Sequence, residues 1–215
     1  MRIVFMGTPD FAVGSLQALC ESGKHEILAV VTQPDRPKGR GNKLLQTPVK
    51  EYALAQGLTV YQPQKVKTPE FVELLHELQP ELIVVAAFGQ FLSKEILELP
   101  KYGCINVHAS LLPKYRGAAP IQYAIIKGEK ESGVTIMQMD IGMDTGAMLD
   151  KVVVPIEENT TMGELHYALR EQGAALLLQV IDKIAAGTAV AEPQDNEQAT
   201  YATLLDRSME HIDWS

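Results

Sequence analysis

Short, mostly apolar runs separated by helix-like stretches constrain this sequence more than any other feature. Such runs occupy residues 2–6 (RIVFM), 26–31 (EILAVV) and 81–87 (ELIVVAA), and a further candidate strand covers residues 103–108. Strands that are apolar on both faces are typical of a parallel sheet covered by helices on both sides. The pattern predicts an α/β fold with a doubly wound, mostly parallel and Rossmann-like sheet.

The second half of the chain is less regular. We expect, in chain order, a helix, two strands and a long helix at residues 118–127, 134–139, 147–154 and 161–186. Gly173 is expected to interrupt the last helix. We assign residues 1–187 to one folded domain and residues 188–215, which are polar and irregular, to an extension that begins a linker.

The composition is that of an ordinary soluble protein, with 46% apolar residues and a net charge of −8. No run approaches the roughly 18 apolar residues that span a bilayer, and the short apolar start is too brief for a signal peptide. Cys20 and Cys104 leave at most one disulfide and no metal-binding spacing. We expect a monomer in the reducing cytoplasm, without membrane association.

A basic loop stands out on this acidic background. DRPKGRGNK, residues 35–43, carries four cations against one carboxylate. It lies in a connection much longer than the usual length of about 4–6 residues, and such loops are usually functional or disordered. The overall negative charge argues against nucleic-acid binding by the whole surface, so a contact of that kind would be local.

The stretch NVHASLLPKYRG, residues 106–117, places an amide, an imidazole and a hydroxyl at alternate positions. In an extended strand, Asn106, His108 and Ser110 would share one face. His108 ends an apolar strand, where open α/β sheets bind ligands; a hydrogen-bonded structural histidine is the alternative. Metal ligation is less favoured, because no second histidine or cysteine stands at ligand spacing.

Asp144 lies between glycines in IGMDTGAM, residues 141–148. One interpretation is a hairpin turn, where aspartate and glycine are favoured. The other is a site, because a carboxylate beside an imidazole orients it for acid-base catalysis, and Asn106 could donate to an oxygen that becomes negative in the transition state. Together these residues would suit acyl transfer without a nucleophile from the protein.

The turn GTPDFA, residues 7–12, also has two interpretations. It could bind phosphate at a helix N-terminus, or it could be a structural turn between strand and helix. The absence of the three-glycine fingerprint favours the structural turn.

Several of these motifs together resemble the formyltetrahydrofolate-dependent transferase family. They are GTPDFA, TQPDRPKGRG, GCINVHASLLPKYRGAAPIQ, GVTIMQMDIGMDTG and the final IDW. The resemblance covers residues 1–215, and NVHASLLPKYRG is its most specific part. QPDRPKGRG narrows it to members that formylate methionyl-tRNA.

The resemblance implies a donor, 10-formyltetrahydrofolate, and an acceptor, the α-amino group of methionine on initiator tRNA. Asn106, His108 and Asp144 match the family's catalytic residues. The asparagine would bind the formyl oxygen, the histidine would stabilise the tetrahedral intermediate and move protons, and the aspartate would orient the imidazole or a water. No metal or nicotinamide is implied.

Further positions match the family's binding residues. Those implied for folate are Phe88, Gly89, Gln90 and Leu92, in a loop whose backbone reads the pterin, and Ser110, Leu111, Leu112 and Pro113 in SLLP. Those implied for tRNA are Arg36, Lys38, Arg40 and Lys43 in the basic loop. The loop's glycines and prolines suggest that it becomes ordered when tRNA binds, and a solvated, mobile loop is the alternative.

Family members continue into a β-rich C-terminal domain that helps to hold tRNA. We therefore expect this chain to be an isolated catalytic domain, in which folate chemistry survives better than tRNA affinity. Three other functions compete: formyl transfer to an amino sugar, hydrolysis of formyltetrahydrofolate, and folate or nucleotide binding without turnover. Loss of activity on substituting Asn106 or His108 would separate the enzymes from the binding module.

Overall fold

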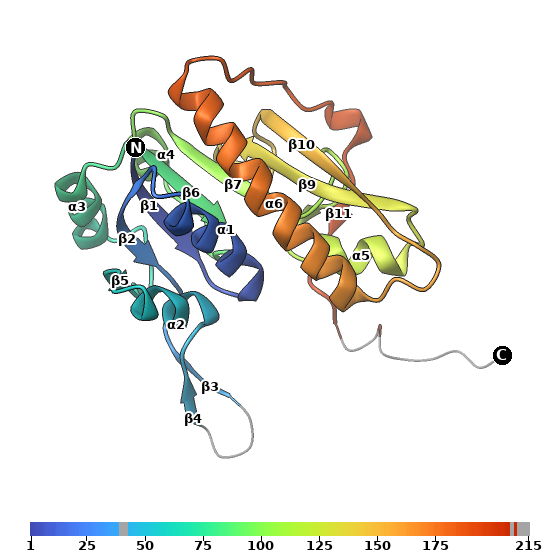
Figure 1. Cartoon of the computed structure of the whole chain (residues 1–215), viewed down its shortest axis with the longest axis horizontal. Helices are drawn as coiled ribbons and strands as arrows, with labels where there is room; N and C mark the ends of the chain where they lie inside the picture. The colour runs from blue at the N-terminus through green and yellow to red at the C-terminus, as the bar shows by residue number, and fades with distance from the viewer. Residues whose placement is uncertain (39–42, 207–208, 210–215) are drawn as a thin grey trace.

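The computed structural model describes residues 1–38, 43–206 and 209, and in this part of the chain the main sheet has seven strands in the order β10-β9-β7-β6-β1-β2-β5 (Figure 1). The five strands from β7 to β5 run parallel to one another, whereas β9 pairs antiparallel with both of its neighbours, β7 and β10. The predicted doubly wound, mostly parallel sheet is confirmed. Its strands are β1 (Arg2–Gly7), β2 (Glu26–Val31), β5 (Val60–Tyr61), β6 (Leu82–Ala86), β7 (Cys104–His108), β9 (Glu131–Gln138) and β10 (Met148–Pro155).

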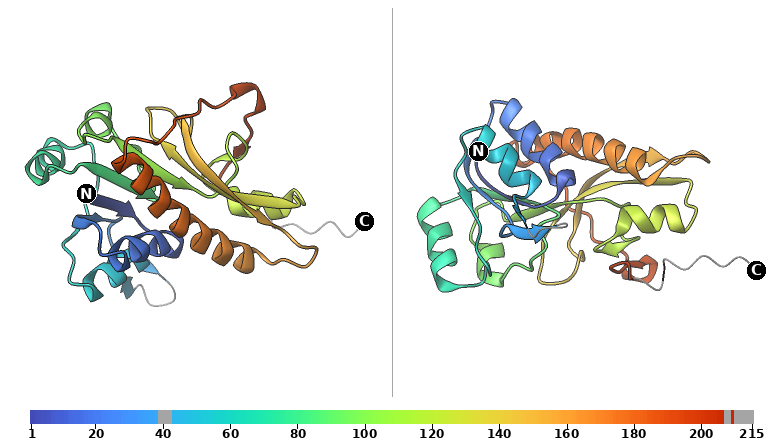
Figure 2. Two further views of the ribbon diagram at one scale, coloured as in Figure 1. Left: turned by 45° about the horizontal axis from the view of Figure 1, so that its top comes forward. Right: turned by 90° about the horizontal axis from the view of Figure 1, so that it is seen from below.

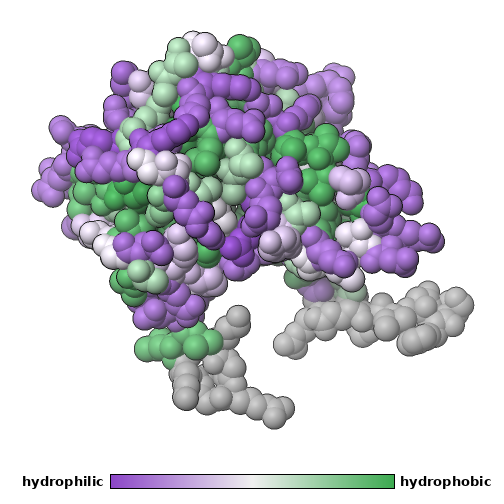
Figure 3. Space-filling view, in the orientation of Figure 1, coloured by the Kyte–Doolittle hydropathy of each residue, from purple (hydrophilic) through white to green (hydrophobic). Residues whose placement is uncertain are grey.

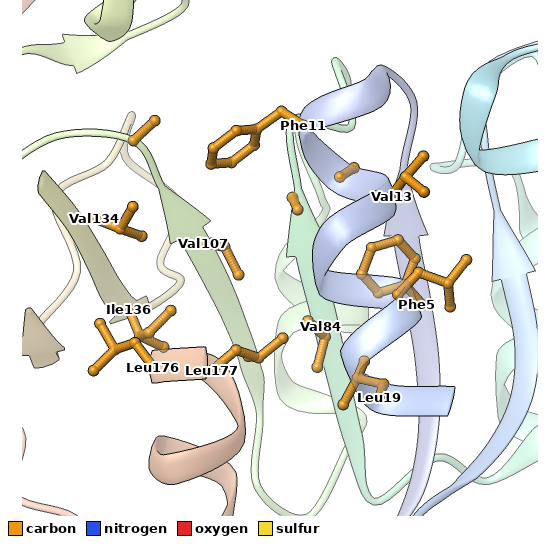
Figure 4. Packing of buried hydrophobic residues seen from close by; sticks show 14 of the residues in the cluster. Phe5, Phe11, Val13, Leu19, Val84, Val107, Val134, Ile136, Leu176 and Leu177 are labelled. Carbon is orange, nitrogen blue, oxygen red and sulfur yellow. The ribbon is translucent and has the colours of Figure 1, made fainter. Parts of the chain in front are cut away.

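Helices cover both faces of the sheet. Figure 2 shows α1, α2 and α6 on one side and α3 and α4 on the other. Within β1, Ile3 and Phe5 join the apolar cluster under α1 and α6, while Val4 and Met6 join the cluster under α3 and α4. Figure 4 shows Phe5 and Val84 of the first cluster close to α1, and Leu176 and Leu177 of the same cluster on α6. The helices are α1 (Asp10–Glu21), α2 (Pro48–Ala55), α3 (Pro69–Leu78), α4 (Lys94–Glu98), α5 (Pro120–Ile126) and α6 (Met162–Ala185).

The predicted break in the last helix is wrong. α6 continues through Gly173, which is buried against the sheet. A Cβ atom at this position would lie 3.2 Å from both Cγ atoms of Val134 on β9. Glycine therefore allows the helix to approach the sheet closely instead of ending it. Thr161 and Glu164 begin the helix with a capping box, as the sequence pattern favours.

Two short ladders add to the main sheet. One is the antiparallel hairpin of β3 (Arg36–Lys38) and β4 (Lys43–Leu45), which projects from the body of the molecule near α2 (Figure 1). The two described arms of the basic loop therefore form short strands, which the sequence did not predict. The other ladder pairs β8 (Arg116–Gly117) with β11 (Tyr201–Ala202) in parallel. The sequence did not predict it, because strands this short have no visible periodicity.

The segment after α6 folds back on the domain. Glu192 bridges to Met148 at the start of β10, a 3₁₀ turn covers Asn196–Gln198, and β11 follows. A domain end at residue 187 remains a prediction, and these contacts favour placing residues 192–202 with the domain. Among the described residues, no helix combines the length and apolar composition needed to cross a membrane.

Candidate active site

A cavity of about 830 Å³ opens at the C-terminal ends of β1, β6 and β7. It is lined by Pro9 after β1, by residues 87–92 after β6, and by residues 106–109 on and after β7. The strand order reverses between β1 and β6, and open α/β sheets bind ligands at such a reversal. The volume is within the range of small-molecule sites, about 300–1,000 Å³.

His108 is the last residue of β7, and its side chain is buried, with only 5% of the residue exposed. Its Nε2 atom lies 2.9 Å from the backbone oxygen of Tyr115. A carbonyl oxygen can only accept a hydrogen bond, so Nε2 carries the hydrogen. Nδ1 is therefore the atom that can take or give a proton, and it lies 3.7 Å from Oδ2 of Asp144.

Asp144 reaches His108 from the loop between β9 and β10. Its φ of 55° is left-handed, a region that aspartate adopts more readily than most residues. The N–H of Gly117 donates to Oδ2 at 2.8 Å, and Nδ2 of Asn106 lies 3.4 Å from Oδ1. Asp144 thus has the backbone of a turn while its carboxylate faces the imidazole, so the turn and site interpretations are compatible.

Asn106 lies two residues before His108 on β7, and both side chains line the cavity, as the alternation predicted. The prediction that Ser110 shares this face is wrong. β7 ends at His108, and the N–H of Ser110 donates to the oxygen of His108 at 2.9 Å, which turns the chain. The Ser110 hydroxyl instead donates to the backbone oxygen of Lys114 at 2.6 Å.

Tyr115 supplies the carbonyl that holds His108, and two hydrogen bonds fix this residue in a left-handed conformation with a φ of 58°. Its N–H donates to Oγ1 of Thr200 at 2.9 Å, and its hydroxyl donates to the carboxylate of Glu129. Burial, together with Glu129, raises the pKa of Tyr115 to about 12. The hydroxyl therefore remains a donor at neutral pH, and the strained backbone is held at both ends of the residue.

Comparison with known proteins places this arrangement in a family. The formyl transferase family model matches residues 1–181. The chain belongs to the formyl transferase family. A methionyl-tRNA formyltransferase of Caldanaerobacter subterraneus is 57% identical over the whole of this chain and 69% of its own length.

Solved formyl transferases share the fold. An N-formyltransferase of Helicobacter canadensis, in complex with folinic acid and dTDP-3-aminofucose, aligns with a TM-score of 0.70 and 26% identity over 94% of this chain and 70% of its own. A glycinamide ribonucleotide transformylase of Symbiobacterium toebii aligns with a TM-score of 0.73 and 20% identity, over 91% of this chain and 94% of its own. At 20% identity, the match to the Symbiobacterium enzyme shows only that the fold is shared.

The loop predicted to read the pterin in this formyl transferase forms one wall of the cavity. Phe88, Gly89, Gln90 and Leu92 all line it. The Thr8 hydroxyl donates to the oxygen of Phe88 at 2.9 Å, so the first βα turn supports this loop. The side chain of Gln90 points away, accepting from the N–H of Val66 at 3.0 Å. The loop is thus fixed at Phe88 through its backbone and at Gln90 through its side chain.

The other stretch implied for folate is placed differently. Ser110, Leu111, Leu112 and Pro113 do not line the cavity that the described residues form. Leu112 is buried against Met137 and Met148, and its N–H donates to the hydroxyl of Thr135 at 3.1 Å. The Thr135 hydroxyl donates in turn to the oxygen of Ser110 at 2.7 Å. Ser110 and Leu112 are thus bound to residues of β9 and β10, and a direct contact of this stretch with folate stays a prediction.

The cationic residues are only partly described. Arg36 lies exposed on β3, the backbones of Lys38 and Lys43 end and begin the hairpin strands, and Arg40 lies outside the described residues. Lys50 anchors the hairpin base, because its Nζ contacts Oδ2 of Asp35 at 2.5 Å. That hydrogen bond lowers the pKa of Asp35.

Sequence reasoning gave no site role to several residues that the structure brings to the cavity. His166 and Met162 of α6 line it, and His166 packs edge-on against Phe11 with ring centroids 5.8 Å apart. Their helix is far along the chain, so no local motif marks them. Among the described residues, no group of three or more histidine, cysteine, aspartate or glutamate side chains could hold a metal ion.

Proposed function

We propose that this formyl transferase moves the formyl group of 10-formyltetrahydrofolate to the α-amino group of methionyl-tRNA. The observation that carries the proposal is that Asn106, His108 and Asp144 meet in one cavity at the carboxyl ends of the parallel strands. The acceptor is supported by relatives that are 55–57% identical over the whole chain and are methionyl-tRNA formyltransferases. The donor is supported by the folinic acid bound to the Helicobacter enzyme.

The three residues can act on a formyl group attacked by an amine. Asn106 Nδ2 carries two hydrogens, so it can contact Asp144 and also donate to the formyl oxygen as negative charge develops. His108 Nδ1 can take the amine proton and deliver it to N10 of the folate as the bond from the formyl carbon to N10 breaks. Asp144 would stabilise the imidazolium formed in between. One C–N bond forms and one breaks, so no other reactant is required.

The donor fits the wall made by the loop from Phe88 to Leu92. Left-handed φ angles at Ala87 and Gly89 turn the backbone here, and the cavity is lined mainly by apolar side chains. A flat, polar-edged ring such as the pterin is bound well by apolar faces combined with backbone donors and acceptors. Met139 and Met143 on the opposite loop offer adaptable apolar contacts.

The β3–β4 hairpin is our candidate for the tRNA contact. It projects from the body and carries Arg36, Lys38, Arg40 and Lys43. Leu44 and Leu45 on β4 are 69% and 48% exposed, and Figure 3 shows apolar surface at this point. Cations can bind the phosphates while exposed apolar side chains pack against unpaired bases.

A formylation assay tests the function. Wild-type protein should formylate initiator methionyl-tRNA with 10-formyltetrahydrofolate, and His108→Ala should reduce the rate by about 10²–10⁴-fold. His76→Ala, at an exposed histidine on α3, is the matched control and should retain full activity. Turnover with a dTDP-amino sugar instead of tRNA would overturn the acceptor, and formate release without any amine would indicate a hydrolase.

Salt dependence tests the hairpin. The Arg40→Ala/Lys43→Ala variant should weaken methionyl-tRNA binding and reduce the slope of log affinity against log salt by about one for each phosphate that is no longer neutralised. The control Lys94→Ala/Lys127→Ala removes the same charge from exposed positions on α4 and after α5. An equal decrease of slope in both variants would show that only overall charge matters.

A further inference from the structure

The segment that follows α6 packs against the chain next to the proposed active site. β8 and β11 pair in parallel, and the N–H of Arg116 donates to the oxygen of Thr200 at 2.9 Å. Gly117 has a φ of 113°, and a Cβ atom on it would lie 2.7 Å from the oxygen of Ala202. The chain on both sides of Gly117, whose N–H binds the Asp144 carboxylate, is therefore fixed by this later segment.

Arg116 carries a charge into the interior, and its side chain binds amide oxygens there. The residue is 2% exposed, and its Nε and Nη2 atoms donate to Oε1 of Gln194 at 3.0 and 2.8 Å. Nη2 also donates to Oδ1 of Asn196 at 2.8 Å. A buried cation needs such bonds, so the oxygen of the Gln194 amide is oriented toward the guanidinium. The NH₂ group of Gln194 consequently points away from Arg116.

Gln194 uses that NH₂ group to hold the Asp144 loop. Its Nε2 atom donates to the backbone oxygen of Asp144 at 2.8 Å and to that of Gly146 at 2.7 Å. An amide side chain has two donor hydrogens and two acceptor lone pairs, so all four are engaged. The cation at its oxygen polarises the amide and strengthens both donated bonds. Asp144 is thus held by its backbone on one side and by its carboxylate on the other.

We propose that Gln194 is a positioning residue of the formyl-transfer site, oriented by Arg116 and acting through the backbone of Asp144. The proposal rests on the function proposed above, in which the Asp144 carboxylate serves His108. Gln194 is only 9% exposed, and it lies beyond residue 181, where the family match ends. The segment after α6 then contributes to the formyl-transfer site through the side chain of Gln194.

Gln194→Glu separates positioning from folding. The carboxylate keeps the acceptor oxygens for Arg116 and adds an ion pair, so the buried cation stays satisfied. It has no hydrogens to donate, and it places negative oxygen against the oxygens of Asp144 and Gly146. Gln198→Glu is the matched control, because Gln198 is exposed on the same segment and its amide binds Asp195.

Three measurements on the full chain follow: kcat and KM with methionyl-tRNA, the melting temperature, and hydrogen exchange of residues 140–147. Loss of two hydrogen bonds of about 1 kcal/mol each corresponds to a fall in kcat of about 30-fold for Gln194→Glu. KM should change by less than about threefold, because neither substrate contacts Gln194 in this proposal. Exchange of residues 140–147 should be faster by a similar factor, while Gln198→Glu matches wild type.

Hydrogen exchange needs no substrate, so it distinguishes failure of this proposal from failure of the proposed function. Unchanged exchange and unchanged kcat in Gln194→Glu would overturn the positioning role. A loss of kcat that only follows a lower melting temperature would also overturn it, because that is the signature of a purely structural residue. If the wild-type protein does not act on methionyl-tRNA but Gln194→Glu still exchanges faster at residues 140–147, the positioning role of Gln194 is supported and the proposed acceptor is rejected.

Discussion

The proposed active site is built from two regions that hold their side chains by different means. Asn106 and His108 stand on β7, which is hydrogen-bonded to β6 on one side and to β9 on the other. Asp144 stands on the loop after β9, which is fixed by side chains and turns from distant parts of the chain. The strand sets its residues through regular backbone pairing, and the loop depends on a few individual contacts. We therefore expect the loop to be the region where single substitutions alter activity most selectively.

The largest expected effects come from the reacting groups themselves. His108→Gln removes the proton carrier and should lower kcat by about 10³-fold. Asp144→Asn should cost less, about 10²-fold, because the new side chain can still accept from the N–H of Gly117, although it loses the charge and the oxygen that accepts from Asn106. Comparing kcat for the two variants, with folding checked by circular dichroism, tests this order. A larger loss for Asp144→Asn would mean that the carboxylate does more than assist the imidazole.

The sequence predicted the strand half of the site and left the loop half open, for a physical reason. Alternation is a local property, so the shared face of Asn106 and His108 could be inferred directly. The position of Asp144 depends on Gly117 and Gln194, which are 27 and 50 residues away along the chain. No local pattern encodes such contacts. The main sheet was predictable because each apolar strand carries its own signal, whereas β8 and β11 exist only through each other.

A substitution at Gly146 disturbs the loop between β9 and β10 without changing a reacting side chain. A Cβ atom there would lie 1.8 Å from the backbone oxygen of Gln138, so Gly146→Ala must displace the loop from β9. We expect a loss of unfolding free energy of about 3–4 kcal/mol, in the range of severe steric changes. Gly163→Ala, on the first turn of α6 with open space around it, is the control and should be neutral or slightly stabilising. Urea titration measures both, and equal stabilities would show that the loop adapts freely.

Thr135 tests the strand region in the same way. The residue is fully buried on β9, where it pairs with His108. Its hydroxyl donates a hydrogen bond to the oxygen of Ser110 and accepts one from the N–H of Leu112. Thr135→Val keeps the shape and leaves both backbone groups without this partner, so stability should fall by about 2 kcal/mol. Because regular pairing of β7 persists, kcat at low temperature should fall less than in Gln194→Glu. A larger fall in kcat would mean that the strand is as dependent on single contacts as the loop.

The smallest expected effect is an alkaline dependence of stability that reports on β7. Burial raises the pKa of Cys104, the first residue of this strand, to about 12. The unfolded thiol has a pKa of about 8.5, so between these two values the unfolded chain loses a proton that the native chain keeps. The unfolded state then binds fewer protons, and the stability falls as pH rises, by at most about 1.4 kcal/mol per pH unit from this group.

Urea titrations of wild type and Cys104→Ala between pH 8 and pH 10.5 measure this contribution as the difference between their slopes. The substitution lowers stability at every pH by removing the buried sulfur, so the slope carries the information and the absolute value does not. Parallel curves would mean that the thiolate is tolerated inside the fold and that β7 opens locally to admit water. That result would remove the contrast between a fixed strand and a loop held by single contacts, because both halves of the site would then be adjustable.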